Sequence, residues 1–201
     1  MFEAYKYLNN LSWNINKDKI PYPFIIIDNF LSEETYKIVS EKFPDIKLFK
    51  INGDTEANNI GIRIGFSDFS NEMESFWKEF GSYFINDDFF YNFCELYGED
   101  IKNFYPKIYN RIKKKNLNVG IQGINTFDTC DVLLDFQIGI NTPVREVTSV
   151  RGPHLDNKKS LYTALCYLKD VDDNTNSGHF TVYKLKKLKL LTLGSSRSVS
   201  L

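Results

Sequence analysis

The sequence predicts an α+β chain in which helices come first and strands follow. Aromatic residues at helical spacing occupy the region from 71 to about 112. From 119 to 168 the pattern changes to strand-like segments separated by turn residues. A 201-residue chain that is 42% hydrophobic is large enough for one domain with a real core. We therefore expect an α+β domain, or a β-sandwich or barrel that carries an N-terminal helical layer.

The N-terminal part predicts a strand followed by a capped helix. Residues 21–31 form a β-branched and aromatic run bounded by prolines, which is typical of a buried strand. Ser32 offers a helix N-cap, two glutamates follow it in the first turn, and Pro44 ends the helix. A second strand is expected near the end of 46–66, in the sequence NIGIRIGF.

The middle of the chain predicts several helices. Phenylalanines recur at i, i+4 and i+8 and indicate a helix surface that faces the core; they are Phe76, Phe80 and Phe84. A second helix is expected to begin near Asp87 or Asp88, and a third near Glu99.

The stretch DVLLDFQIGIN (131–141) has the clearest strand pattern of the chain. Its apolar residues alternate with polar or small ones, which are Asp135, Gln137, Gly139 and Asn141. This period of two predicts a strand with one apolar face and one polar face, and the polar face could line the mouth of a barrel. SLYTALCYLKD (160–170) is apolar on both faces and predicts a central strand, and HFTVYK (179–184) predicts another.

Charge and composition exclude several classes of protein. The net charge of −1 gives no basic field for nucleic acid, and the basic runs 111–115 and 184–189 are interpreted as solvated surface. No segment is apolar for the length of a membrane span, and the N-terminus lacks the apolar stretch of a signal peptide. We therefore expect a cytoplasmic protein without nucleic-acid or membrane partners.

The three cysteines do not form a metal or disulfide pattern. Cys94, Cys130 and Cys166 are unevenly spaced and odd in number, and the chain has no CxxC. This spacing argues against a disulfide framework and against a zinc ribbon. Cys94 and Cys166 lie in apolar stretches and are predicted to be small core residues.

The triplet His154-Leu155-Asp156 is the strongest chemical signal in the chain. It follows a Gly-Pro turn and precedes a predicted strand, so both side chains can point toward one metal ion. Two histidines and one carboxylate on one face of a metal are typical of non-haem iron sites. An H-x-D pair by itself is weak evidence, since a loop salt bridge would use the same residues.

The flanking sequence resembles the iron(II)- and 2-oxoglutarate-dependent oxygenases, in their prolyl-hydroxylase-like branch. PYPFIIIDNFLSEETYKIVSEKFPD (21–45) is similar to the opening strand and helix of that family. DFQIGINTPVREVTSVRGPHLDNKK (135–159) is similar to its strand, loop and H-x-D element, and LYTALCYLKDVDDNTNSGHFTVYK (161–184) to the hairpin that follows. Together these segments cover most of the chain from 21 to 184.

The resemblance implies both a fold and a reaction. The fold is a double-stranded β-helix, a jelly-roll barrel, here forming one domain over 1–201 with a strand and helix layer in 1–115 and the barrel core in 116–201. The reaction uses Fe(II), O₂ and 2-oxoglutarate, with ascorbate as a further option, to hydroxylate an unactivated C–H bond and release succinate and CO₂. His154 and Asp156 take the first two ligand positions.

The third metal ligand has no clear counterpart. In the family a second His follows several strands later, and an Arg after it binds the far carboxylate of 2-oxoglutarate. The chain has two His in all, and we interpret His179 as a strand residue on a solvated face, with metal ligation in a rearranged site as the alternative. Arg197 in SSRSVSL resembles the carboxylate-binding Arg, and Gln137 and Arg151 are further candidates for binding 2-oxoglutarate.

Three explanations of this departure stay open. The barrel could lack its last strands through truncation or a frameshift near residue 185, a divergent site could use water or another side chain, or catalysis could have been lost. The rival function is therefore a non-catalytic jelly-roll binding or interaction module. A small-molecule or peptide substrate is expected, and neither its identity nor the oligomeric state follows from the sequence. Basic residues near the expected barrel mouth could favour an anionic substrate, bind 2-oxoglutarate or be ordinary loop charges; they are Arg145, Arg151, Lys158 and Lys159.

Overall fold

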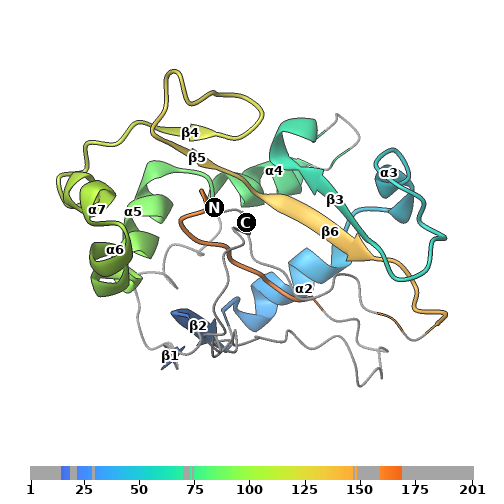
Figure 1. The fold of residues 1–201 in the computed structure, drawn as a ribbon. Helices are drawn as coiled ribbons and strands as arrows, with labels where there is room; N and C mark the ends of the chain where they lie inside the picture. Colours follow the sequence, from blue (N-terminus) through green and yellow to red (C-terminus); the bar gives the residue numbers. More distant parts are fainter. Residues whose placement is uncertain are drawn as a thin grey trace, which may run out of the picture.

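The structure of the chain is a computed structural model that describes residues 15–18, 22–28, 30–69, 73, 75–146, 148 and 159–168. The described part is a mixed α+β fold of six α-helices, one 3₁₀ helix and short strands in small sheets (Figure 1). In chain order the elements are β1 (Ile15–Asp18), β2 (Phe24–Ile27), α2 (Glu33–Glu41), α3 (Ile46–Phe49), β3 (Gly61–Gly65), η1 (Phe66–Asp68), α4 (Ser75–Ser82), α5 (Asp87–Leu96), α6 (Gly98–Phe104), α7 (Pro106–Lys113), β4 (Val119–Ile121), β5 (Val132–Leu134) and β6 (Gln137–Asn141).

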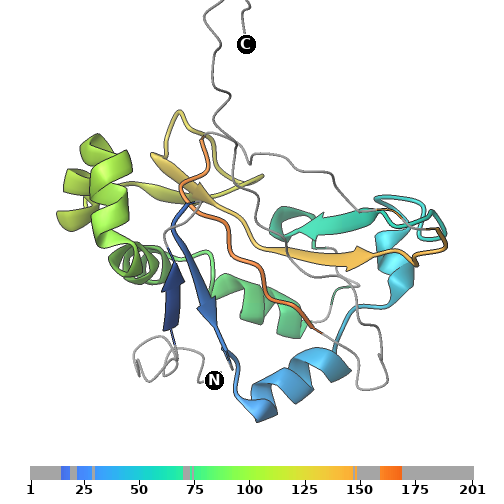
Figure 2. The same cartoon turned by 60° about the horizontal axis from the view of Figure 1, so that its bottom comes forward.

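The antiparallel pair β3–β6 joins the two halves of the sequence. Gly61 lies opposite Asn141 and Gly65 opposite Gln137, so the two strands are aligned over their full length. The two strands lie side by side in both views, with α2 and α4 on one side of them (Figures 1 and 2). Two further pairs are formed by β1 with β2, which is antiparallel, and by β4 with β5, which is parallel.

One apolar cluster lies between the β3–β6 pair and the helices α2, α3 and α4. Alternate strand residues point into it, and Ile62, Ile64 and Ile138 are each at most 5% exposed. Helix residues close the cluster from the other side; they are Val39, Phe49, Phe76, Trp77 and Phe80, together with Met73. Burial of these side chains supplies most of the free energy that holds the helices against the strands.

A second cluster packs α5, α6 and α7 against the β4–β5 pair. Its centre is Phe90, which is fully buried, and Cys94 lies beside it at 2% exposure. Burial raises the pKa of the Cys94 thiol to about 12, so the thiol stays protonated at neutral pH and behaves as a small apolar group.

Phe136 connects the two clusters. Its ring contacts both sets of residues and lies between β5 and β6 in the sequence. It stacks on Phe84 with ring centroids 5.5 Å apart, and it meets Phe80 edge-on at 6.1 Å. Because one side chain is shared, the two clusters form a continuous core rather than two separate ones.

The helix signals in the sequence correspond to real caps. The Ser32 hydroxyl accepts a hydrogen bond from the Thr35 N–H at 3.1 Å, so α2 starts where predicted. Asn86 caps α5 in the same way by accepting from the Phe89 N–H at 2.9 Å. The region expected to hold one helix from Glu99 is divided into α6 and α7, because Pro106 begins a new helix there.

Two sequence predictions differ from the structure. The described part of 160–170 belongs to no strand: Tyr162 contacts Phe93 with centroids 4.2 Å apart, while Leu165 and Tyr167 are about 60% exposed. Cys166 is exposed as well, so it is not the core residue we predicted. An apolar composition alone does not decide whether a segment finds a neighbouring strand. No helix within the described ranges is long and apolar enough to cross a membrane.

Gly81 of α4 provides a test of the packing between the clusters. A Cβ at this position would lie 2.8 Å from Phe136 Cδ1 and 2.9 Å from Phe66 Cδ2. Overpacking costs about 1–3 kcal/mol and outweighs the helix propensity gained, so Gly81→Ala should destabilise the fold by about 1–2 kcal/mol in urea unfolding. The matched control is Gly98→Ala, because nothing lies within 4 Å of that Cβ. Equal stabilities of the two variants would contradict this packing.

A second test concerns the buried Tyr91 hydroxyl. It accepts from the Leu117 N–H at 3.1 Å and donates to the Leu117 C=O at 3.3 Å, which ties α5 to the segment before β4. Tyr91→Phe leaves both backbone groups without this partner and should cost about 1–3 kcal/mol of unfolding free energy. Tyr105→Phe, at a residue that is 42% exposed, is the control and should change thermal stability little. A similar loss of stability in both variants would show that the Tyr91 hydroxyl makes no specific contribution to the fold.

Candidate functional site

Most of the residues that the sequence singles out lie outside the described ranges. This applies to His154, Asp156, His179, Arg151 and Arg197. Gln137 is described, as are Arg145 and Lys159 of the basic residues near the expected barrel mouth. The candidate site is therefore built from the strand pair that leads into the H-x-D loop.

The β3–β6 pair has one buried face and one polar face, as the alternation predicted for residues 137–141. The stretch 131–141, predicted as one strand, is divided into β5 and β6, which pair in different sheets. On β6, Ile138 and Ile140 point into the core, whereas Gln137, Gly139 and Asn141 are exposed. On β3 the exposed positions are held by Gly61 and Arg63, with the half-buried Gly65 at the strand end. Residues opposite each other in an antiparallel pair point to the same side, so these six residues form one surface, which we call the polar face.

Carboxylates gather at one end of the polar face. The Gln137 Nε2 donates to Asp135 Oδ2 at 2.6 Å, and Asp68 of η1, just after β3, lies close by. Loss of hydration raises the pKa of the Asp135 carboxyl, and the Asp68 charge adds to the rise; hydrogen bonds from Gln137 and the Phe136 N–H act in the opposite direction. The amide of Gln137 is therefore oriented by a carboxylate that is less acidic than usual.

The chain that leaves β6 is fixed before it reaches the H-x-D loop. The Thr142 hydroxyl accepts from the Ile60 N–H at 2.9 Å, and the Thr142 N–H donates to the Ile60 C=O at 2.8 Å. Asn58 Oδ1 then accepts from the N–H groups of Arg145 and Glu146 at 2.6 and 3.1 Å. The loop that carries the metal-ligand candidates thus starts from an anchored position about ten residues earlier in the chain.

Arg145 is engaged in an ion pair. Its Nη2 lies 2.9 Å from Glu56 Oε2, with both side chains more than half exposed. An exposed pair of this kind contributes little stability, but it competes with any anionic ligand for the guanidinium. This contact makes Arg145 a weaker candidate for substrate binding than the sequence suggested.

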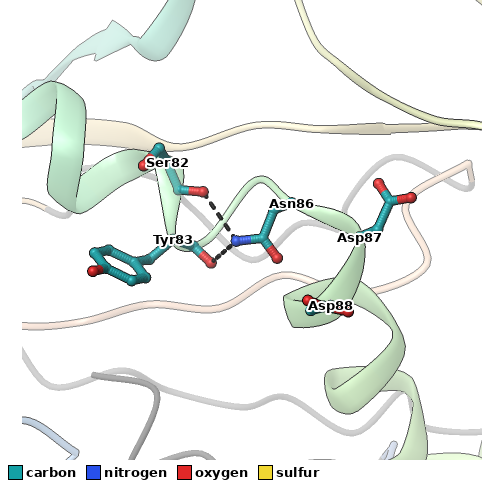
Figure 3. Close-up of a pocket in the computed structure, with 5 residues that line it drawn as sticks. All are labelled: Ser82, Tyr83, Asn86, Asp87 and Asp88. Atoms are coloured by element: carbon teal, nitrogen blue, oxygen red, sulfur yellow. Dashed lines mark hydrogen bonds between the residues drawn. The ribbon is translucent and has the colours of Figure 1, made fainter. Parts of the chain in front are cut away.

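A hollow at the turn between α4 and α5 has a structural explanation. It is lined by Ser82, Tyr83, Asn86, Asp87 and Asp88 (Figure 3). Asn86 uses its Nδ2 to donate to the C=O groups of Ser82 and Tyr83, while its Oδ1 caps the helix. The two aspartates lie in the first turn of α5, where the helix dipole favours negative charge. These side chains therefore serve the end of α4 and the start of α5.

Comparison with known proteins assigns no family or function to the chain. No family model matches the chain, and no curated protein or solved structure shows significant similarity to it. Among the residues that the structure describes, no group of three or more His, Cys, Asp or Glu side chains is placed to hold a metal. The sequence reasoning missed Arg63 on the polar face and Asp68 beside its end. The strict alternation in GIRIG, with Arg63 between two inward isoleucines, was the signal for Arg63.

Asp131 and Asp135 predict opposite responses to pH. The Arg111 side chain, which donates to Asp131 at 2.7 Å through both Nη1 and Nη2, lowers the pKa of the Asp131 carboxyl. Its stabilising effect is present above the ordinary carboxyl pKa of about 3.9 and is lost as pH falls through the lowered value. Asp135 has a raised pKa, so the fold loses stability as pH rises from about 3.9 through that raised value.

The asparagine variants test both signs by thermal unfolding across pH. Asp131→Asn should unfold at a lower temperature than the wild type at neutral pH, and this difference should shrink in acid. Asp135→Asn should be at least as stable as the wild type at neutral pH, with the advantage vanishing in acid. Parallel pH profiles for the two variants would contradict the opposite environments of these carboxyls.

Proposed function

We propose that the chain is an iron(II)- and 2-oxoglutarate-dependent oxygenase with a double-stranded β-helix core, in which His154 and Asp156 bind the metal. The observation that carries the proposal is the strand, loop and H-x-D element. β6 buries one face in the core, presents a polar face on the other side, and continues through an anchored segment toward the H-x-D triplet. This order of features is what the resemblance to the oxygenases implies for 135–159.

The donor chemistry of the triplet fits ferrous iron. An imidazole and a carboxylate are two of the three ligands in the facial set that leaves positions open for a co-substrate. Such a centre, when bound, supplies the oxidising power to hydroxylate an unactivated C–H bond with O₂ and 2-oxoglutarate. Within these 201 residues the third ligand would be His179 in a rearranged site, or a water molecule or another side chain.

The polar face would serve as the wall of the substrate cavity. Gln137 is held by Asp135 with its amide on this exposed face. Its role would be to orient a bound small molecule through the remaining amide hydrogen and oxygen. A substrate that is a small molecule or an extended peptide is compatible with such a wall.

The alternative is a binding module that keeps the shell without the chemistry. The incomplete set of metal ligands favours it, because two ligands hold iron less tightly than three. In that case the polar face would bind a ligand without oxidising it, and the two histidines would have no role in common.

An anaerobic titration separates these functions. Purified protein is mixed with Fe(II) and 2-oxoglutarate in the absence of O₂, and the weak visible charge-transfer band of the iron–2-oxoglutarate complex is recorded. The wild type should give the band, and His154→Ala should lose it because a metal ligand is gone.

His179→Ala is the matched control, since it removes the same kind of side chain. The His179→Ala variant should keep the band if His179 is a solvated strand residue. Loss of the band in this variant would instead identify His179 as the third ligand. No band in the wild type, or an equal band in His154→Ala with native circular dichroism in both proteins, would contradict the oxygenase proposal and favour the binding module.

A further inference from the structure

Arg63 has an unusual setting on the polar face. It lies opposite Gly139 of β6, and a Cβ on that glycine would come within 2.3 Å of Arg63 Cδ and 2.6 Å of Nε. A Cβ on Gly61 would come within 3.0 Å of Nη1 and 3.2 Å of Nη2. The side chain therefore lies flat across two glycines, and it occupies this position because neither neighbour carries a side chain.

Backbone groups hold the guanidinium in this place. Its Nη1 donates to the Ile140 C=O at 3.0 Å and to the Ile62 C=O at 3.1 Å. The Asn52 Nδ2 donates to the Arg63 C=O at 2.9 Å, which fixes the backbone of the same residue. A flexible arginine side chain normally loses considerable rotamer entropy when it binds a ligand, and here most of that freedom is already restricted.

The guanidinium keeps donors available for a ligand. In the described part of the chain its Nη2 and Nε make no hydrogen bond, and no carboxylate oxygen lies within 4 Å of its nitrogens. Arg145, by contrast, is paired with Glu56. A positioned, exposed guanidinium with an open edge matches the planar, two-oxygen geometry of a carboxylate.

The surroundings favour a carboxylate over a phosphate. The carboxylate end of the polar face begins near Gly65, two residues from Arg63 along β3 and hence roughly 7 Å away. Asp68 and Asp135 would repel the double charge on one phosphate group more strongly than the single charge that one carboxylate group presents to the guanidinium.

We infer that Arg63, seated on Gly61 and Gly139, is the binding site for a carboxylate group of a small molecule on the polar face. The assignment of this face as the substrate side rests on the proposed function, whereas the binding of a carboxylate by Arg63 requires no metal. The carboxylate belongs either to the substrate or to the dicarboxylate co-substrate, and both are recognised by the same guanidinium edge.

The test is a titration of the full chain in the presence of a chelator. The arginine Nε–H signals of ¹⁵N-labelled protein are followed by NMR while acetate, succinate, 2-oxoglutarate or inorganic phosphate is added, with chloride at matched ionic strength. One signal should shift saturably with a carboxylate, and it should be the signal that is missing in Arg63→Gln. Affinity for the probe should fall about tenfold or more in that variant, since a charge-assisted hydrogen bond is lost. Arg145→Gln is the matched control and should keep the wild-type affinity.

Gly139→Ala separates binding from folding. Its methyl group collides with the movable end of Arg63 and not with backbone, so the strand should form while the guanidinium is displaced and binding weakens. Tighter binding of 2-oxoglutarate than of acetate would assign the site to the co-substrate, and equal binding would assign it to a substrate carboxylate. The inference is overturned if no signal saturates, if phosphate binds more tightly than every carboxylate, or if Arg63→Gln and Gly139→Ala both bind like the wild type. Because iron is absent, a failure here leaves the charge-transfer result of the oxygenase test unaffected.

Discussion

The pairing of β3 with β6 is the constraint on which the rest of the structure depends. It brings residues 61–65 against 137–141, more than 70 positions apart in the chain, and its register decides which side chains point into the core. A shift of β3 by one residue would turn Ile62 and Ile64 to the outside and bury Arg63. Burial of these isoleucines against α2, α3 and α4 therefore selects the register, and the register in turn places Arg63 opposite Gly139.

The same pairing positions the segment after β6. Since the strand ends at Asn141 beside Gly61, the next residues meet the loop before β3. The Asn58 side chain and the backbone groups of Ile60 hold these residues by hydrogen bonds. At the other end of β6, Phe136 fills the space between the two clusters and requires Gly81 on the facing helix. The polar face is thus fixed at both ends of β6, by the anchored segment after Asn141 and by the packed ring of Phe136. The positions of its residues are set by the packing of the opposite, buried face of the same strands.

Local patterns predicted the elements better than their partners. The Ser32 cap, the burial of Phe76 and Phe80 on α4 and the alternation within β6 each report a preference of neighbouring residues, and each was confirmed. The ends of the elements were predicted less well, because α4 stops before Phe84 and the expected strand 131–141 is divided into β5 and β6. The segment 160–168 was misjudged because its apolar composition fits either a central strand or a segment that crosses the core surface, and only long-range packing distinguishes the two. The same limit applies to the site. Alternation predicted that Gln137 would be exposed, but the contact of Arg63 with Gly139 depends on a strand pairing that no local pattern specifies.

The glycines of the polar face argue that something must approach these strands closely. Glycine weakens a strand because it orders a flexible backbone and packs no side chain, yet Gly61, Gly65 and Gly139 hold three of the six positions on this face. The buried face of the same two strands carries isoleucines, so glycine is not simply common throughout this segment. Arg63 accounts for both glycines, since a Cβ on Gly139 would collide with its side chain and a Cβ on Gly61 would crowd its guanidinium. The guanidinium of Arg63 lies against the two strands, where its Nη1 donates to backbone C=O groups. The two glycines and the position of the guanidinium therefore form one arrangement, in which a side chain at either glycine would displace the arginine.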